Sequence, residues 1–443
     1  MMAPREAETG QATADGSGAG LFSETLKGVF MSRVLIIGAG AAGLMAAVHA
    51  ASAGARTTVL ERNEKPGKKI YLTGKGRCNV TNDCAPDEFM REVPRNPRFL
   101  YSALDYFQPR DMMEWLRENG CPTVTQRGRR VFPATEKASD VTRTLTAACR
   151  RLGVEILLNR RVTEILRNGD GSAAGAVTEP GGTVEADAVI LATGGASYPA
   201  TGSTGDGYLF AERLGHTVIP PVPSLVGLES AESWPRSLQG LSLRNVRVTL
   251  REGKKTLYTE LGEMLFTHFG FSGPLILEAS CHLPEPFGNC SLEADLKPGL
   301  TREQLDARLL RDLEAGGKKQ LRNILPGLMP SSMAELFPSL CGLPEDLPCS
   351  QVRAAQRESL LNRLKALPLT PAGRRPLAEA IVTRGGVSVR EVNPGTMESR
   401  LIPGLYFAGE VLDVDAHTGG YNLQIAFSTG ALAGSSAAVR GPA

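Results

Sequence analysis

Apolar and polar residues near the start of the chain predict a strand, a helix and a second strand in immediate succession. Residues 34–37 are four consecutive aliphatic side chains, as in a strand that is buried on both faces. A turn rich in glycine and alanine follows, then an alanine-rich run over residues 44–53 that favours a helix, and residues 57–61 predict another strand. The whole unit spans 29 residues, from 33 to 61, which is the size of a βαβ unit.

The same pattern returns further along the chain and is interrupted once. We expect buried strands at residues 154–158 and 186–191 and at a stretch ending in 404–410, with helices at 99–120, 136–152 and 423–439. Near residue 217 the pattern changes, and Pro220, Pro221 and Pro223 mark a boundary. Beyond it, residues 245–250 alternate as in an antiparallel strand, and 302–315 and 349–366 are typical of helices.

This change of pattern predicts an α/β fold in which one domain is built from both ends of the chain and another is inserted between them. We expect a disordered tail at residues 1–31, the α/β domain at 32–216 and 377–443, a β-rich insertion at 217–300 and 367–376, and a helical subdomain of the insertion at 301–366.

The composition is that of a globular protein and excludes several classes. Of 443 residues, 42% are hydrophobic and 22% charged, with a net charge of +2, so the chain is not a collagen-like, coiled-coil or wholly disordered protein. No run of about 18 apolar residues occurs, and we expect no membrane span. The eight cysteines show neither a Cys-x-x-Cys pair nor zinc spacing, which predicts no metal site and a cytoplasmic setting with reduced thiols. Nothing in the sequence sets the oligomeric state.

Glycine is in excess, at 49 of 443 residues, and the first glycine cluster is the main chemical signal. In the turn after the first strand, Gly38 permits the tight turn, Gly40 lets the backbone approach a pyrophosphate, and Gly43 allows the helix to pack closely on the strand. Glu61 ends the second strand, where its carboxylate can accept hydrogen bonds from ribose hydroxyls and would repel a 2′-phosphate. These residues predict a dinucleotide-binding site.

Two further glycine turns favour FAD as the dinucleotide. Residues 192–195 and 406–410 each join a strand to a glycine turn, where more backbone can approach one long cofactor. Residues 418–422 open the last apolar helix, whose N-terminus would stabilise the negative charge of a reduced flavin. Ordinary strand-end turns and core packing of the helix remain the alternative interpretation.

With these motifs the chain resembles the BaiN/RdsA-like (YhiN-like) family of FAD-dependent oxidoreductases. The matching stretches are 36–43, 60–63, 66–69, 74–82, 192–195, 202–207, 265–274, 383–387 and 419–424. They extend over nearly the whole chain apart from the tail. The resemblance implies a glutathione-reductase-type FAD-binding Rossmann domain with an inserted β-rich plus helical domain.

The glycine turns and the resemblance together predict a set of residues that hold FAD. The set is Gly38, Gly40, Ala41, Ala42, Gly43, Glu61, Arg62, Lys69, Gly76, Arg77, Cys78, Asn79, Val162, Thr193, Gly194, Gly409, Glu410, Gly420, Tyr421 and Asn422. Within the loop at 74–82, Arg77 can pair with phosphate, and Asn79 can bind edge atoms of the flavin.

Cys78, His268 and His417 are the candidate catalytic residues. A redox-active disulfide would need a second thiol beside Cys78, and Cys84 lies six residues on, so packing or a flavin contact is the favoured role of Cys78. His268 and His417 are candidates for proton transfer. The alternative for His268 is a hydrogen-bonded histidine at a domain interface, and family members commonly carry other residues where this chain has His417. Tyr198 and Tyr421 are also possible proton donors.

The expected activity is that of an FAD-dependent NAD(P)H oxidoreductase. The resemblance implies that flavin passes hydride from NAD(P)H to a conjugated C=C bond, either of uridine in 23S ribosomal RNA or of a steroid of the bile-acid type. Residues 56–151 hold 19 Lys and Arg against 12 Asp and Glu, and this basic segment favours RNA over a small-molecule acceptor. A small-amine oxidase and a non-catalytic FAD-binding protein remain alternatives. Because a second G-x-G-x-x-G motif after a strand is absent, we expect NAD(P)H to dock transiently.

Overall fold

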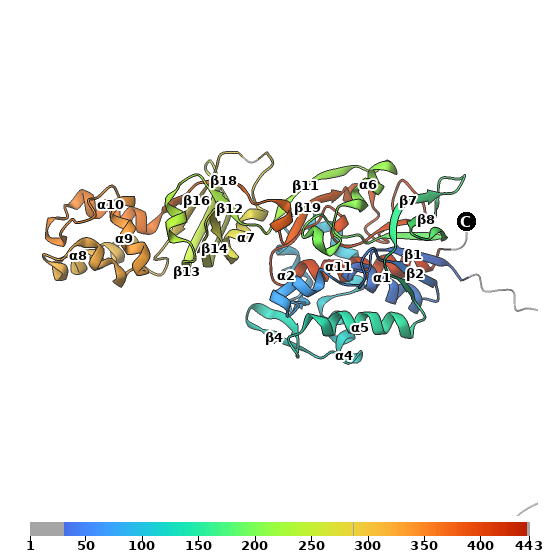
Figure 1. Ribbon diagram of the computed structural model, residues 1–443. Helices are drawn as coiled ribbons and strands as arrows, with labels where there is room; N and C mark the ends of the chain where they lie inside the picture. The colour runs from blue at the N-terminus through green and yellow to red at the C-terminus, as the bar shows by residue number, and fades with distance from the viewer. Residues whose placement is uncertain (1–30, 287, 441–443) are drawn as a thin grey trace, which may run out of the picture.

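The computed structural model describes residues 31–286 and 288–440, and its central element is a parallel sheet. Among these residues the sheet has five strands in the order β20-β10-β1-β2-β6 (Figure 1). The strands are β1 (Arg33–Ile37), β2 (Arg56–Leu60), β6 (Glu155–Leu157), β10 (Ala188–Leu191) and β20 (Leu405–Phe407). The first and last segments of the described chain therefore share one sheet, and β10 pairs in parallel with both β1 and β20.

Two helices beside this sheet pack on each other through close backbone contact. They are α1 (Ala41–Ser52) and α11 (Tyr421–Ala438). A Cβ atom added at Gly430 would lie 2.3 Å from the carbonyl oxygen of Ala42, and one added at Gly434 would lie 2.2 Å from that of Ala46. Because glycine has no Cβ, the two backbones can touch, and α11 is held directly against the helix that follows the first glycine turn.

Within the described residues, the same part of the chain contains further helices and two small, separate antiparallel sheets. The helices are α2 (Pro86–Arg91), α3 (Tyr101–Tyr106), α4 (Pro109–Glu118), α5 (Ala138–Arg151) and α6 (Asp206–Arg213). One small sheet has the order β3-β5-β4 and the other β7-β8-β9. Their strands are β3 (Thr81–Asn82), β4 (Thr123–Gln126), β5 (Arg130–Pro133), β7 (Arg161–Arg167), β8 (Ala173–Glu179) and β9 (Gly182–Glu185).

The chain leaves the part that contains the parallel sheet, called the parallel-sheet part below, and returns to it through a two-stranded antiparallel ribbon. The outgoing strand is β11 (Val218–Ser224) and the returning strand is β19 (Val382–Val387), paired from Val218 with Val387 to Ser224 with Val382. This pairing brings the two ends of the intervening segment together. It fixes where the inserted residues emerge relative to the parallel sheet.

The inserted segment forms an antiparallel sheet with the strand order β17-β16-β13-β14-β15-β12-β18. The strands are β12 (Leu228–Ser230), β13 (Ser242–Glu252), β14 (Lys255–Phe266), β15 (Gly270–Ser272), β16 (Cys290–Asp295), β17 (Leu367–Leu369) and β18 (Pro371–Arg374). Buried and exposed residues alternate along β13, so one face of the sheet packs on a core and the other meets solvent. Helix α7 (Pro274–Cys281) lies between this sheet and the parallel one (Figure 1).

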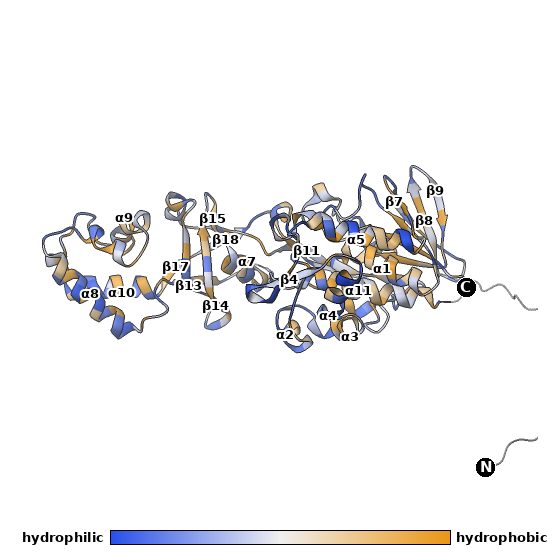
Figure 2. Cartoon of the chain, turned by 90° about the horizontal axis from the view of Figure 1, so that it is seen from below, coloured by the Kyte–Doolittle hydropathy of each residue, from blue (hydrophilic) through white to orange (hydrophobic). Residues whose placement is uncertain are grey.

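Three helices extend the insertion at the end of the molecule far from the parallel sheet (Figure 1). They are α8 (Arg302–Gly316), α9 (Ser331–Leu340) and α10 (Ala354–Lys365). Along α8, Leu305, Leu309 and Leu313 recur every four residues and are buried, while hydrophilic residues cover the remaining surface (Figure 2). This arrangement confirms the predicted α/β fold with a β-rich and helical insertion.

Residues 99–120 are helical over most of their length, as expected, but they do not form one continuous helix. The segment forms α3 and α4, separated by Phe107 and Gln108, and α4 begins at Pro109. Proline has no backbone N–H and suits the first position of a helix, so it starts α4 instead of continuing α3. No helix in the described part of the chain is long and apolar enough to cross a membrane. The expectation of a disordered tail at residues 1–31 lies outside the described residues, except for Met31.

Candidate functional site

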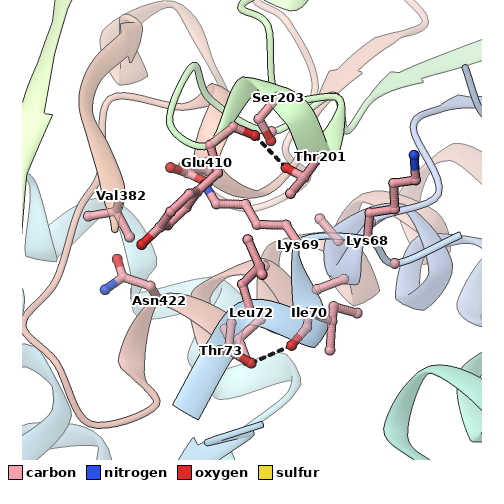
Figure 3. A pocket seen from close by; sticks show the side chains of 18 of the residues that line it. Lys68, Lys69, Ile70, Leu72, Thr73, Thr201, Ser203, Val382, Glu410 and Asn422 are labelled. Carbon is pink, nitrogen blue, oxygen red and sulfur yellow. Dashed lines mark hydrogen bonds and ion pairs between the residues drawn. The ribbon is translucent and has the colours of Figure 1, made fainter. Parts of the chain in front are cut away.

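A cavity of about 690 Å³ opens at the carboxyl ends of the parallel strands (Figure 3). Its walls come from the β1–α1 turn, the ends of β2 and β10, the loop after β2, and the residues before and within α11. Ligands of open α/β sheets bind at this edge, because the loops that follow neighbouring parallel strands meet there. The volume is typical of a small-molecule or cofactor site.

The turn between β1 and α1 is shaped to leave its backbone open to the cavity. Gly38 has φ +104°, and a Cβ there would lie 2.5 Å from the carbonyl oxygen of Ala192. A Cβ at Gly43 would lie 1.8 Å from the oxygen of Gly38, so this glycine lets the helix pack on the turn. By contrast, a Cβ at Gly40 would have no described atom within 4 Å. Gly40 therefore leaves room for a group that approaches the N-terminus of α1.

The N-terminus of α1 itself is available for an anion. Ala41 and Ala42 line the cavity, and within the described structure no side chain caps this end of the helix. The first turn also carries no acidic residue. Backbone N–H groups at a helix start carry a partial positive charge, so this end favours a negatively charged ligand.

Glu61 is held rigidly at the end of β2. Its side chain is 7% exposed, and Oε2 accepts a hydrogen bond from the backbone N–H of Ala39 at 2.8 Å. Oε1 accepts two more from Asn63, from the backbone N at 2.9 Å and from Nδ2 at 2.7 Å. These bonds fix the carboxylate beside the glycine turn, where it lines the cavity.

Lys69 and Glu410 form an ion pair that connects three segments of the chain around the cavity. Lys69 Nζ lies 2.6 Å from Glu410 Oε2 and donates to Ser197 Oγ, also at 2.6 Å. Glu410 Oε1 in turn accepts from the backbone N–H of Thr383 at 2.7 Å. Figure 3 shows Lys69 extending toward Glu410. Opposite charges therefore stabilise the meeting point of the loop after β2, the turn after β20 and strand β19.

The loop at residues 74–82 contributes Arg77 and Asn79 to the cavity and keeps Cys78 out of it. Arg77 stacks over the ring of Phe132, 4.5 Å from its centroid, and pairs with Glu136 at 3.2 Å. Asn79 Oδ1 is buried and has no hydrogen-bond partner among the described residues. Cys78 is fully buried, and burial raises the pKa of its thiol to about 12. The structure thus places Cys78 in the core as a protonated thiol.

A second unpartnered oxygen belongs to the side chain of Thr193. Thr193 Oγ1 is buried without a hydrogen-bond partner in the described part of the chain, and Thr193 lines the cavity after β10. Buried polar atoms are normally satisfied, so an unpaired one beside a cavity indicates a bound group that supplies the partner. Thr193 Oγ1 packs against Gly207, where an added Cβ would lie 2.0 Å from it, so the unpaired oxygen that indicates a polar ligand is that of Asn79.

The far end of the cavity is apolar and is built by residues around the insertion. Leu225, Pro274, Leu277, Ile381 and Val382 line it, and Figure 3 shows the position of Val382. These residues come from β11, α7 and β19 or from the connections next to them. The sequence patterns did not single them out, because their clustering depends on the β11–β19 pairing. An apolar, flat group would fit this end.

His417 lines the cavity just before α11, and both of its ring nitrogens have protein partners. Nδ1 lies 3.0 Å from Oε2 of Glu92, and Nε2 lies 2.8 Å from Nε2 of His282. The backbone N–H of His417 also donates to the carbonyl of Glu92 at 2.9 Å. Glu92 and His282 were not among the predicted site residues, because no local motif marks them.

His268 lies away from the cavity. It is exposed in the turn between β14 and β15, with its ring edge-on to Phe269 at 5.1 Å between centroids. It is not among the described residues that line the cavity. The structure therefore brings His417, but neither His268 nor Cys78, to the candidate site.

Most of the predicted cofactor-binding residues line the cavity. Those that do are Gly38, Gly40, Ala41, Ala42, Glu61, Arg62, Lys69, Arg77, Asn79, Val162, Thr193, Gly194, Glu410, Gly420 and Asn422. Those that lie behind the wall or beside it are Gly43, Gly76, Cys78, Gly409 and Tyr421. Gly409 N–H donates to Thr429 Oγ1, and the Tyr421 ring packs edge-on against Phe89. Both residues thus support the wall rather than form its surface.

Positive charge dominates the cavity. Its basic lining residues are Arg62, Lys68, Lys69, Lys75, Arg77, Arg130, Arg160 and Arg161, against the acidic Glu61, Asp206 and Glu410. Lys75, Arg130 and Arg161 are exposed, so part of this charge faces solvent at the cavity edge. The described residues contain no cluster of three or more His, Cys, Asp or Glu that could hold a metal. The cavity therefore suits an anionic organic ligand.

Comparison with known proteins places the chain in a family. It matches the HI0933-like protein Rossmann domain family over residues 32–436. It is 33% identical to a 3-dehydro-bile acid delta(4,6)-reductase of Clostridium scindens, over 93% of this chain and 100% of that protein. It is 34% identical to a ribosomal RNA dihydrouridine synthase of Haemophilus influenzae, over 90% of this chain and 96% of that protein.

A solved structure shares the fold. The 3-ketosteroid-delta4-(5alpha)-dehydrogenase of Rhodococcus jostii RHA1 superposes with a TM-score of 0.50 at 18% identity, over 92% of this chain and 97% of that chain. The family match covers most of the chain, and both similar sequences carry the names of enzymes. The chain is therefore an enzyme of the HI0933-like Rossmann family.

Proposed function

We propose that this enzyme is an FAD-dependent oxidoreductase that takes hydride from NAD(P)H and reduces a conjugated C=C bond. Bound FAD supplies an acceptor and donor of hydride that the side chains of a protein cannot supply. The open space at Gly40 and the uncapped start of α1 fit the pyrophosphate. Glu61 fits the ribose, and the unpartnered oxygen of Asn79 fits a polar edge of the cofactor.

The N-terminus of α11 supports the placement of the flavin end. Gly420 and Asn422 line the cavity there, and α11 carries neither a side-chain cap within the described structure nor an acidic residue in its first turn. A partial positive charge at this end of a helix stabilises negative charge on a bound ring. The apolar residues beyond it would exclude water from the reacting carbon atoms.

We propose RNA as the acceptor, with uridine in 23S ribosomal RNA as the reduced base, and a cytoplasmic enzyme accordingly. One observation carries this choice: the exposed cationic residues Lys75, Arg130 and Arg161 at the edge of the cavity. Phosphodiester groups on either side of a base need such charges, whereas a steroid does not. The similar protein of Haemophilus influenzae is named as a ribosomal RNA dihydrouridine synthase, which agrees with the choice.

The direct test is single-turnover reduction of unmodified ribosomal RNA. The FAD-bound protein is reduced anaerobically with NADPH or NADH, mixed with 23S RNA transcribed in vitro, and the RNA is analysed for dihydrouridine by mass spectrometry. We expect dihydrouridine at a defined position, and lower yield with Arg130→Ala. Arg110→Ala serves as the matched control, because Arg110 lies on α4 with its side chain 80% exposed and does not line the cavity.

If the wild-type protein forms no dihydrouridine in the RNA, RNA is not the acceptor. If NAD(P)H does not bleach the flavin, NAD(P)H is not the reductant. Peroxide release on mixing with amines would instead indicate an oxidase.

A steroid enone is the second candidate, and the apolar end of the cavity favours it. Leu225, Leu277 and Val382 would pack against a fused-ring hydrocarbon. The bile-acid reductase of Clostridium scindens is as similar to this chain as the RNA enzyme. Reduction of a 3-oxo-4,6-diene steroid by the pre-reduced protein, without reduction of RNA, would establish this alternative.

A further inference from the structure

A pair of histidines joins the inserted segment to the parallel-sheet part beside the cavity. His417 precedes α11 and lines the cavity, and His282 caps the C-terminal end of α7. Their Nε2 atoms lie 2.8 Å apart, although 135 residues separate them in sequence. A contact this short requires a hydrogen bond, because two lone pairs or two N–H groups would repel each other at that distance.

The partners of the pair determine where its proton can be. A carboxylate only accepts hydrogen bonds, so the Nδ1 of His417 that faces Glu92 must carry hydrogen. One further proton therefore lies between the two Nε2 atoms. It belongs to His282 when His417 is neutral and to His417 when His417 is an imidazolium ion.

The surroundings disfavour a positive charge on His282. Burial, together with the positive charges of His417 and Arg384, lowers the pKa of His282 to about 4. Arg384 donates to the carbonyls of Cys281 and Leu283, on both sides of His282. His417 faces the carboxylate of Glu92, whose side chain is 39% exposed and can exchange protons with solvent.

A second carboxylate from the insertion completes the surroundings. Glu278 of α7 accepts from Thr418 Oγ1 at 2.7 Å and from the hydroxyl of Tyr258 at 3.2 Å. The Tyr258 ring also packs against His282, at 5.4 Å between centroids. Both rings of the pair are thus held in place, and the charged groups that face them are Glu92, Glu278 and Arg384.

We propose that His417 is the proton donor of the reduction and that His282 and Glu92 are its positioning residues. The proposal rests on the proposed function. Bound, reduced FAD would supply the hydride for the C–H bond at one carbon of the C=C, and the proton on Nε2 of His417 would go to the other carbon. The broken N–H bond leaves its electron pair on His417, and a solvent proton that arrives beside Glu92 restores the imidazolium.

The position of α7 explains how the acceptor gains access to that proton. Pro274 and Leu277 of α7 line the same apolar end of the cavity as His417. An acceptor seated there contacts both the helix that carries His282 and the segment that carries His417. It can therefore separate the two rings and take the place of His282 as the partner of Nε2.

The first test measures the two halves of the reaction separately. His417→Gln, His282→Gln and Glu92→Gln are compared with two control variants. One is Glu88→Gln in α2, the helix that ends just before Glu92, and the other is His49→Gln in α1, a histidine that does not line the cavity. Reduction of the bound flavin by NADPH should stay at the wild-type rate in all five variants. Product formation by the pre-reduced enzyme should fall by about 100-fold or more in His417→Gln.

The positioning residues should show a different signature. His282→Gln and Glu92→Gln should retain part of the product formation, and the pH dependence of that step should differ from the wild type. An unchanged pH profile in His282→Gln would refute its positioning role, and near wild-type product formation by His417→Gln would refute the proton donor. If the wild type reduces neither RNA nor a steroid enone, the proposed function fails.

A second measurement decides the pairing without any substrate. The chain has five histidines, so the ring signals of the FAD-bound protein can be assigned by NMR from single variants. We expect the titration of the His417 signal to change in His282→Gln and to stay unchanged in His49→Gln. Independent titration of the two rings would overturn the pair even where the protein proves to be a reductase.

Discussion

Two glycines of the same turn allow one experiment to distinguish an effect on cofactor binding from an effect on the stability of the fold. Gly40 and Gly43 lie three residues apart, at the start of α1, and both belong to the predicted dinucleotide motif. Their surroundings are opposite. A Cβ at Gly43 would lie 1.8 Å from the backbone oxygen of Gly38, whereas a Cβ at Gly40 would have no described atom within 4 Å.

The expected costs follow from these distances. In Gly43→Ala the helix must move by more than 1 Å to bring the contact up to about 3 Å. Overpacking against backbone costs about 3 kcal/mol, and the better helix propensity of alanine returns about 1 kcal/mol, so we expect a net loss of about 2 kcal/mol. Gly40 has φ −81° and ψ −168°, which alanine adopts without strain, so Gly40→Ala should cost less than about 1 kcal/mol.

The effect on FAD should be the reverse of the effect on stability. The methyl group of Gly40→Ala occupies the space through which a phosphate would reach the N-terminus of α1. We expect FAD affinity to fall at least about tenfold, equivalent to about 1.4 kcal/mol. Urea unfolding of the FAD-free variants measures the stability of the fold, and quenching of flavin fluorescence on binding measures the affinity for FAD.

Either of two results would refute this reasoning. Wild-type FAD affinity in Gly40→Ala would show that the cofactor does not approach the turn. Equal loss of stability in Gly40→Ala and Gly43→Ala would show that the open space at Gly40 does not exist in solution.

Three further predictions test other parts of the structure. Lys69→Met leaves the Glu410 carboxylate without its cation and should lower the free energy of unfolding by about 1–2 kcal/mol, measured by thermal unfolding. The double variant Lys69→Met/Glu410→Gln should recover part of that loss, and equal stability of all three proteins would show that the pair contributes nothing. Because burial lowers the pKa of His282 from 6.5 to about 4, the unfolded chain binds that proton more readily, and stability should fall as pH drops from 6.5 to 4. Urea unfolding should show a smaller fall in His282→Gln, and an identical fall would contradict burial of this ring. The buried thiol of Cys78 should stay unlabelled by a thiol reagent in the folded protein, as mass spectrometry of the treated chain would show; rapid labelling would contradict its place in the core.

The residues that sequence patterns located are those whose role is decided within a few positions of the chain. The strand, glycine turn and helix at 33–53 form a local unit, and Glu61 follows at the end of the next strand, so all of them could be predicted before any contact was known. Pro109 shows the limit of periodicity alone. The apolar pattern continues across it, although proline ends the hydrogen bonding of one helix and starts the next.

The residues that sequence patterns missed depend on contacts between distant segments. Glu92 and His417 are 325 residues apart, and no motif links them. The small sheet β3-β5-β4 consists of strands of two to four residues, whose pairing gives only a weak periodic signal. His268 shows the opposite error. It belongs to a distinctive local motif and is therefore a candidate site residue, but the fold places it in an exposed turn away from the cavity.

The division of the cavity between the two parts of the chain explains how one scaffold can serve different acceptors. The glycine turn, Glu61 and the start of α11 belong to the parallel-sheet part, and they would hold the cofactor whatever the acceptor is. Leu225 and Leu277 belong to the insertion and its connection, so substitutions there can reshape the acceptor end without disturbing the turn at Gly40. The His282–His417 contact is formed by one residue from each part. A change in the position of the insertion would therefore alter both proton delivery and the shape of the acceptor end of the cavity. Acceptor specificity and protonation should therefore change together in this enzyme, while cofactor binding stays constant.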